Sequence, residues 1–258
     1  MSISCLGEVF VELKSTKHLS ECSSFEVTIG GLAAKIATEL SNLGINVKFF
    51  CALGNDVFNE LLTDWLSSMG VDVRRTKKNL RTTLLITLNN DVKIFFRKPY
   101  FSSADTELTL NDINLNDILE SDALLCTSLT LTENPLKHTI HYVAKNMFKN
   151  SKKTFLYIST TYPYKLSDNE MLSILKYTSH ALIDYKALPL FGTTKPKTLA
   201  HIIFRKTESV GKVAIIYDNK MLSYDRSSYE VMLNINHYSK IKHVATYISE
   251  EIGKKLAK

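Results

Sequence analysis

Short apolar segments with strand character alternate with amphipathic helical segments along most of the chain. Residues 3–13 are apolar and β-rich, and residues 30–44 place apolar side chains at helical spacing before Gly44, a typical helix stop. Residues 46–53 again favour a buried strand. This alternation is typical of an α/β protein with a mostly parallel central sheet flanked by helices. Further strands are predicted at 123–129, 154–159, 181–185, 212–217 and 220–225, and further helices at 54–70, 135–148, 169–177, 197–206 and 241–252.

One segment departs from the alternation. Residues 82–96, TTLLITLNNDVKIFF, read as a hairpin of two strands around residues 89–91. A hairpin placed early in an otherwise alternating chain indicates a small β appendage on the α/β body. No linker, low-complexity segment or internal repeat separates the chain into parts, so we expect residues 1–258 to form a single domain with an appendage.

Composition narrows the class of protein. Hydrophobic residues make up 45% and charged residues 22% of 258 residues, as in ordinary globular proteins, and no apolar run reaches membrane-spanning length. The first residues lack a secretion signal, and the four cysteines are scattered without a C-x-x-C pair, so we expect reduced, buried thiols, a cytoplasmic location and no metal site. The net charge is +6, with its densest basic run at 74–81. No aromatic residues interleave with that run, which favours a solvated loop over a nucleic-acid surface.

Four collinear blocks in the first half resemble the ribokinase-like (PfkB) carbohydrate kinase family. They are GEVFVEL at 7–13, the glycine pair and helix at 29–44, the block at 51–73 that resembles G-x-D-x-F-G, and LLCTSLTLTENP at 124–135. The last is closest to fructokinases and 2-keto-3-deoxygluconate kinases. The resemblance implies a ribokinase-like fold with a β lid from about 10–30 and 80–103. It also implies ATP as phosphate donor, magnesium, and a sugar hydroxyl as acceptor.

The same family places a D-T-x-G-A-G-D block at the start of a C-terminal helix. Glycines let backbone N–H groups approach the migrating phosphate, and the final Asp takes the proton from the sugar hydroxyl. An ungapped placement on this chain puts Ile235 at the first Asp, Tyr238 and Lys240 at glycine positions, and Ile241 at the catalytic base. Isoleucine accepts no proton, so no catalytic residue is assigned here. The alternative, purely structural interpretation is that Ile241 is a core residue of an amphipathic helix.

Other family positions are also altered. The element N-x-x-E, which helps to organise magnesium, would keep Asp184 in place of the Asn but would have Ala187 in place of the Glu. The segment expected beside the adenine, residues 215–225, contains no glycine. We therefore assign no nucleotide-binding residue, and expect ATP and magnesium only if the protein is active. Asn59 replaces the last glycine of the G-x-D-x-F-G block, and Asp56 is expected to be a helix N-cap.

The substrate half keeps four candidate binding residues. The resemblance places Glu12 at a sugar-binding Asp, Gly30 and Gly31 at the glycine pair, and Lys35 at an Asn. The glycines can face a sugar, form a tight turn, or do both. Glu12 and Lys35 carry opposite charges, so an ion pair that fills the site, a retained ligand contact and a plain surface location all remain open.

Histidines offer two weaker possibilities. His138 and His141 have metal-ligand spacing on a helix but no third ligand, which favours a solvated face. His237 and His243 flank the altered block, and either is a candidate substitute base.

Three functions follow. The first is a catalytically impaired pseudokinase that keeps a sugar or small-molecule pocket. The second is an active ATP-dependent sugar kinase with a relocated base. The third is a structural or interaction subunit, such as a homodimer joined through the lid, whose apolar residues are Leu84, Ile86, Leu88, Ile94 and Phe96. Membrane and nucleic-acid partners are not expected.

Overall fold

The apolar segments pair into one central sheet of nine strands in a computed structural model. The structure describes residues 1–258 except 90–91, 161–165, 228–229, 235–238 and 255–258. The strand order is β13-β12-β11-β10-β9-β8-β1-β4-β5. The strands are β1 (Ser2–Leu6), β4 (Asn46–Leu53), β5 (Asp72–Lys77), β8 (Ala123–Thr127), β9 (Lys153–Ile158), β10 (His180–Asp184), β11 (Lys212–Ile216), β12 (Lys220–Asp225) and β13 (Glu230–Asn234).

Parallel pairing dominates this sheet. Every pair from β11 through to β5 is parallel, and only the pairs β11–β12 and β12–β13 are antiparallel. Strands of a parallel sheet are buried on both faces, which explains their nearly continuous apolar sequences. The predicted α/β class with a mostly parallel sheet is confirmed.

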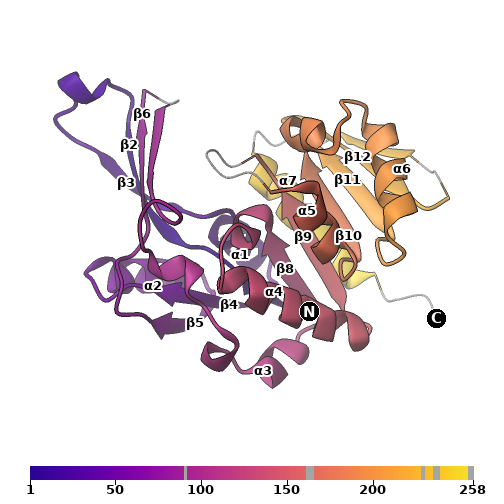
Figure 1. Ribbon diagram of the computed structural model, residues 1–258, viewed down its shortest axis with the longest axis horizontal. Coiled ribbons are helices and arrows are strands. Elements are labelled where there is room, and N and C mark those ends of the chain that lie inside the picture. Colours follow the sequence, from indigo (N-terminus) through magenta and orange to yellow (C-terminus); the bar gives the residue numbers. More distant parts are fainter. Residues whose placement is uncertain (90–91, 161–165, 228–229, 235–238, 255–258) are drawn as a thin grey trace.

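Helices cover both faces of the sheet (Figure 1). One face packs against α1, α2 and α7, and the other against α3, α4, α5 and α6, so that two separate apolar clusters form. The helices are α1 (Leu32–Asn42), α2 (Phe58–Ser68), α3 (Leu115–Leu119), α4 (Leu136–Lys149), α5 (Asp168–Leu175), α6 (Pro196–Lys206) and α7 (Lys240–Gly253).

A second, four-stranded sheet projects from the body, as Figure 1 shows at the end that holds β2, β3 and β6. Its order is β3 (Glu26–Gly30), β2 (Phe10–Ser15), β6 (Leu84–Leu88) and β7 (Val92–Phe96), and β6 and β7 form the predicted hairpin. We call this sheet the lid. Side chains alternate between its two faces. Phe10, Glu12, Leu85 and Phe95 share the inner face, toward a pocket beside α1.

Two local predictions are wrong. The basic run at 74–81 begins inside β5, an edge strand, rather than in a loop. Charged side chains suit such an edge because it exposes unpaired backbone groups to water. Asp56 is not the N-cap of α2, since Val57 holds that position. Its carboxylate accepts hydrogen bonds from Phe58 N (3.2 Å) and Thr82 N (2.7 Å), and so ties α2 to the segment before β6.

Three of the four cysteines are buried, as expected, and Cys22 is only partly buried. Burial raises the pKa of the Cys51 thiol to about 12. Within the described part of the chain, no helix has the length and apolar character needed to cross a membrane.

Candidate functional site

A pocket of about 180 Å³ lies between the inner face of the lid and the N-terminal end of α1. One wall of the pocket is apolar and consists of Phe10, Leu85 and Phe95 from the lid. The polar side includes Glu12, Lys35, Lys93, Ser159 and Thr160. An apolar wall opposite a few convergent polar groups is the usual form of a small-molecule site. The volume is below the usual range of about 300–1,000 Å³, which suits a small ligand.

Glu12 and Lys35 meet in this pocket. Lys35 Nζ lies 3.3 Å from Glu12 Oε2, Lys14 Nζ lies 3.5 Å from the same oxygen, and the Thr87 hydroxyl donates to Glu12 Oε1 at 3.0 Å. Burial alone would raise the pKa of Glu12, but Lys35 and Lys14 lower it below the ordinary glutamate value. The carboxylate is therefore charged and oriented at neutral pH. The ion pair forms part of the pocket wall beside the open volume.

The glycine pair forms the turn from β3 into α1. Gly31 has φ of +100°, and a Cβ atom there would lie 2.4 Å from the Glu8 carbonyl oxygen. A Cβ atom on Gly30 would lie 2.0 Å from the Phe10 ring. The turn therefore requires glycine at both positions, and Gly31 also lines the pocket. Whether either glycine contacts a ligand remains a prediction.

Glu8 holds this turn in place, and the sequence analysis did not single it out. Its side chain is fully buried, and Oε1 accepts hydrogen bonds from Leu32 N (2.8 Å) and Ala33 N (3.1 Å), the first amides of α1. The Thr127 hydroxyl donates to its Oε2 at 3.0 Å. A carboxylate at the start of a helix stabilises the amides there, which have no partner within the helix. The only sequence signal that could have pointed to Glu8 was its place in the GEVFVEL block.

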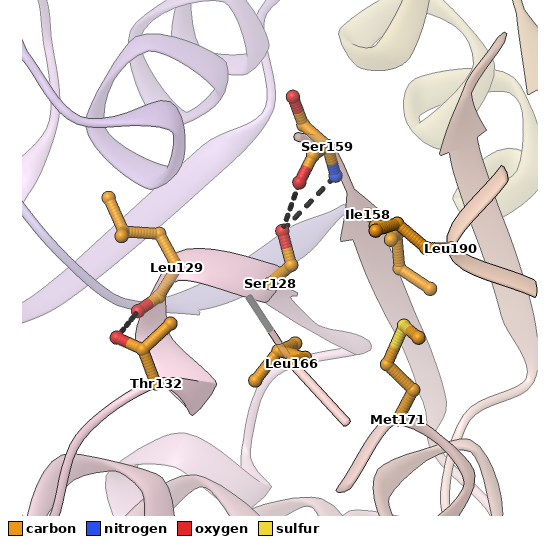
Figure 2. A pocket seen from close by; sticks show the side chains of 8 residues that line it. All are labelled: Ser128, Leu129, Thr132, Ile158, Ser159, Leu166, Met171 and Leu190. Carbon is orange, nitrogen blue, oxygen red and sulfur yellow. Dashed lines mark hydrogen bonds between the residues drawn. The ribbon is translucent and has the colours of Figure 1, made fainter. Parts of the chain in front are cut away.

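A smaller hollow of about 10 Å³ adjoins the pocket and shares Leu129 and Ser159 with it. Figure 2 shows Ser128 and Ser159 facing each other across the ends of two neighbouring strands. The Ser128 hydroxyl donates to Ser159 O at 3.0 Å and accepts from Ser159 N at 3.1 Å. These bonds fix the carboxyl ends of β8 and β9, the edge of a parallel sheet at which α/β proteins bind ligands.

The tip of α7 holds the position predicted for a catalytic base. Ile241 packs against the core cluster and lines an open groove of about 490 Å³ with Trp65 and Leu61. Its side chain is apolar and partly buried, in agreement with the interpretation of a helix core residue. Ile235, His237 and Tyr238 lie outside the described residues, so the predictions made for them are untested.

Lys240, the first residue of α7, contacts two carboxylates. Its Nζ lies 3.0 Å from both oxygens of Asp184, at the end of β10, and 3.3 Å from Asp218 Oδ1. The ammonium also lies 4.6 Å from the centre of the Tyr185 ring. Ala187, at the expected magnesium-organising Glu, is fully buried and offers no ligand.

These residues do not fit a divalent cation. Magnesium needs free carboxylate oxygens, whereas Lys240 already binds those of Asp184. Among the residues that the structure describes, no group of three or more His, Cys, Asp or Glu side chains is placed to hold a metal ion. No catalytic step is therefore assigned to magnesium or to ATP at this edge.

The remaining candidate residues, His141, His243 and Asn59, are buried or partly buried. The His141 Nε2 atom lies 3.3 Å from the Ser173 hydroxyl, and burial, with nearby Lys137 and His138, lowers the pKa of His141. His243 is fully buried. Asn59 is buried and donates to Gly54 O at 2.8 Å, which fixes the first turn of α2.

Known proteins resemble this chain over part of its length. PH1459 from Pyrococcus horikoshii, described as an uncharacterized sugar kinase, is 28% identical over 179 residues, which cover 67% of this chain and 57% of the relative. A 5-dehydro-2-deoxygluconokinase from Mesomycoplasma hyopneumoniae is 26% identical over 153 residues, 55% of this chain and 44% of the relative. The chain thus spans about half the length of these curated relatives.

Solved structures share the fold over nearly the whole chain. The structure of PH1459 in complex with ATP has a TM-score of 0.78 at 18% identity and covers 99% of this chain and 86% of that one. A fructokinase from Xylella fastidiosa has a TM-score of 0.83 at 13% identity, with 98% and 83% covered. The family described as pfkB family carbohydrate kinase matches residues 1–183, which include the lid, the glycine turn and the pocket. The chain belongs to the pfkB family of carbohydrate kinases.

Proposed function

We propose that this protein binds a sugar or a sugar acid in the pocket beneath the lid and is impaired in phosphoryl transfer. The pocket supports the binding half of the proposal. Glu12 is a charged acceptor suited to sugar hydroxyls, and the apolar lid wall suits the C–H face of a sugar ring. Lys93 lines the same pocket and has an exposed side chain, so it is available to an acidic group on the ligand.

The observation that carries the proposal is the side chain at 241. A kinase of this family needs a proton acceptor where α7 begins, and Ile241 supplies a hydrocarbon that packs into the core cluster. A general base contributes typically about 10²–10⁴-fold to a rate. Its loss predicts a protein that keeps its ligand but turns over slowly or not at all.

Calorimetric titration with hexoses, ketoses and sugar acids tests binding, and a coupled assay of ADP release with Mg-ATP tests turnover. We expect a sugar-class ligand to bind wild type, and Glu12→Gln to weaken that binding at least tenfold. Glu60→Gln, an exposed glutamate on α2, is the matched control and should bind as wild type does. Absence of binding by any sugar, or ADP release well above the no-enzyme control, would refute the proposal.

An active kinase with a relocated base is the second candidate, and Asp184 favours it. This carboxylate lies at the tip of α7, where a proton acceptor is needed, although Lys240 binds both of its oxygens. Sugar-dependent ADP release by wild type that falls at least a hundredfold in Asp184→Asn, but not in Asp218→Asn, would replace the first proposal with this one.

A homodimer through the lid is compatible with the binding function, and the outer face of the lid supports it. Residues directly opposite each other on β6 and β7 include the pairs Leu84–Phe96, Ile86–Ile94 and Leu88–Val92, which makes this face apolar. Val92 is 53% and Ile94 37% exposed. An apolar sheet face that remains in water favours association.

Sedimentation velocity over a range of concentrations tests the dimer. Wild type should sediment as a dimer and Ile94→Lys as a monomer. Lys93→Ile changes the neighbouring residue on the inner face and should remain dimeric. A monomeric wild type at every concentration would rule out the dimer.

A further inference from the structure

Lys240, Asp184 and Asp218 come together from three separate elements at the carboxyl edge of the central sheet. Asp184 ends β10, Asp218 follows β11, and Lys240 begins α7. The Lys240 ammonium lies 3.0 Å from each Asp184 oxygen and 3.3 Å from Asp218 Oδ1. One cation is thus held by a buried carboxylate at the end of β10 and by a largely exposed one in the turn after β11.

The ammonium is enclosed as well as paired. The Lys240 side chain is 18% exposed and that of Asp184 is 9% exposed. The Tyr185 ring lies 4.6 Å from Nζ, and it stacks on the Tyr217 ring with the centroids 5.0 Å apart. A carboxylate with this degree of burial needs a counter-charge, because water no longer solvates it fully.

The position of the lysine runs against the local electrostatics of its helix. Positive side chains are unfavourable in the first turn of a helix, where the amide groups already carry partial positive charge. The carboxylates of Asp184 and Asp218 offset this cost and hold Lys240 where it is. The arrangement is therefore a specific ion cluster rather than a solvated surface lysine.

We propose that the Lys240 ammonium is a resident cation that takes the place of a divalent metal at this edge of the sheet. While Lys240 is present, its ammonium occupies both oxygens of Asp184 and one oxygen of Asp218, and the protein binds no divalent ion there. Removing the ammonium frees two carboxylates, the ligand type that Mg²⁺ and Mn²⁺ prefer. This inference deepens the proposed function, on which it rests for the identification of this edge.

Electron paramagnetic resonance of Mn²⁺ tests the inference, because bound Mn²⁺ loses the sharp signal of the free ion. Wild type is expected to bind no Mn²⁺ in the millimolar range. Lys240→Met keeps most of the length of the side chain without its charge, and should bind one Mn²⁺ at least tenfold more tightly than wild type. Lys240→Met combined with Asp184→Asn should lose that gain.

Lys186→Met is the matched control, because Lys186 also lies over the Tyr185 ring (5.9 Å). It should behave as wild type does. If Lys240→Met fails to fold, Lys240→Gln, which is polar but uncharged, serves for the same comparison. Equal Mn²⁺ binding by wild type and the folded Lys240 variant, whether tight or absent in both, would overturn the inference.

Failure of this inference and failure of the proposed function are distinguishable. A wild type that binds Mn²⁺ but releases no ADP would sink the inference alone. A wild type that excludes Mn²⁺ but binds no sugar would sink the proposed function alone. As an independent readout, EDTA and Mg²⁺ should leave the Tm of wild type unchanged, whereas Mg²⁺ should raise the Tm of the Lys240 variant.

Discussion

Replacing Glu8 with alanine should destabilise the fold severely, although Glu8 contacts no solvent and no ligand pocket. Its Oε1 atom is the acceptor for Leu32 N at 2.8 Å and Ala33 N at 3.1 Å. Glu8→Ala leaves both amides without this acceptor at a buried helix start. A buried polar group that loses its partner costs about 1–3 kcal/mol, so the two amides together predict a loss of about 2–6 kcal/mol. That is a large fraction of the about 5–15 kcal/mol typical of a domain.

Glutamine at the same position is the matched control. Both amides donate to Oε1, which glutamine retains, and its Nε2 group can donate to the Thr127 hydroxyl that now donates to Oε2. We therefore expect Glu8→Gln to lose less than about 1 kcal/mol. Urea denaturation followed by circular dichroism measures both variants. A Glu8→Ala protein within about 0.5 kcal/mol of wild type, or equal losses in both variants, would refute the reasoning.

The same pair of variants has a pH signature. Burial raises the pKa of Glu8, although bonds from the Ala33 amide and the charge of Arg97 act in the opposite direction. An unfolded glutamate has a pKa of about 4.3. Between that value and the higher folded pKa, the folded state binds more protons, so wild-type stability falls as pH rises through this window. Glu8→Gln should lack this decline, which urea titrations at several pH values would detect.

Three further predictions concern single sites. Gly31→Ala should lower the free energy of unfolding by about 1–3 kcal/mol and abolish sugar binding, because φ is +100° and the new Cβ would meet the Glu8 carbonyl. Urea denaturation measures the stability and calorimetry the binding, and unchanged values would contradict the prediction. A hydrogen bond from Lys137 lowers the pKa of Glu170 to about 2, so its contribution holds above about pH 4.3 and is lost toward pH 2. Since Glu170 is 37% exposed, Glu170→Gln should cost only about 1 kcal/mol at pH 7 and nothing at pH 2; equal losses at both would refute this. Ellman's reagent should titrate one thiol, Cys22, in the native protein and four after unfolding, and a second fast native thiol would be inconsistent with the structure.

Local patterns were enough to predict most of the sheet and the hairpin, because buried parallel strands are nearly all apolar and the helices show one apolar face. Predictions from local patterns failed where contacts with residues distant in the sequence decide the structure. The segment that became β5 reads as polar because an edge strand buries little, and Asp56 is engaged by Thr82 from a distant segment. The strand β13 and the short helix α3 were not predicted either.

In the candidate site, too, some residues could be predicted from the sequence and others depend on contacts between distant segments. Glu12 and Lys35 could be named from motif positions and opposite charge, and the structure brings them within 3.3 Å. Asp184 and Lys240 were each named as altered motif positions, yet nothing in the sequence joins residues 56 positions apart into one ion cluster. Glu8 was missed because a single carboxylate between two apolar segments has no periodic signal.

The order of strands in the central sheet implies a direction of assembly during synthesis. After β8, each strand from β9 to β13 pairs with the one that precedes it in the chain. A nascent polypeptide can thus extend one growing border as residues leave the ribosome. The contact between α7 and α1 is different, because α1 precedes β4 and α7 follows β13, so this contact joins an early element to a much later one. The apolar face of α1 consequently stays uncovered until α7 has been synthesised, and a chaperone would protect that face during this interval.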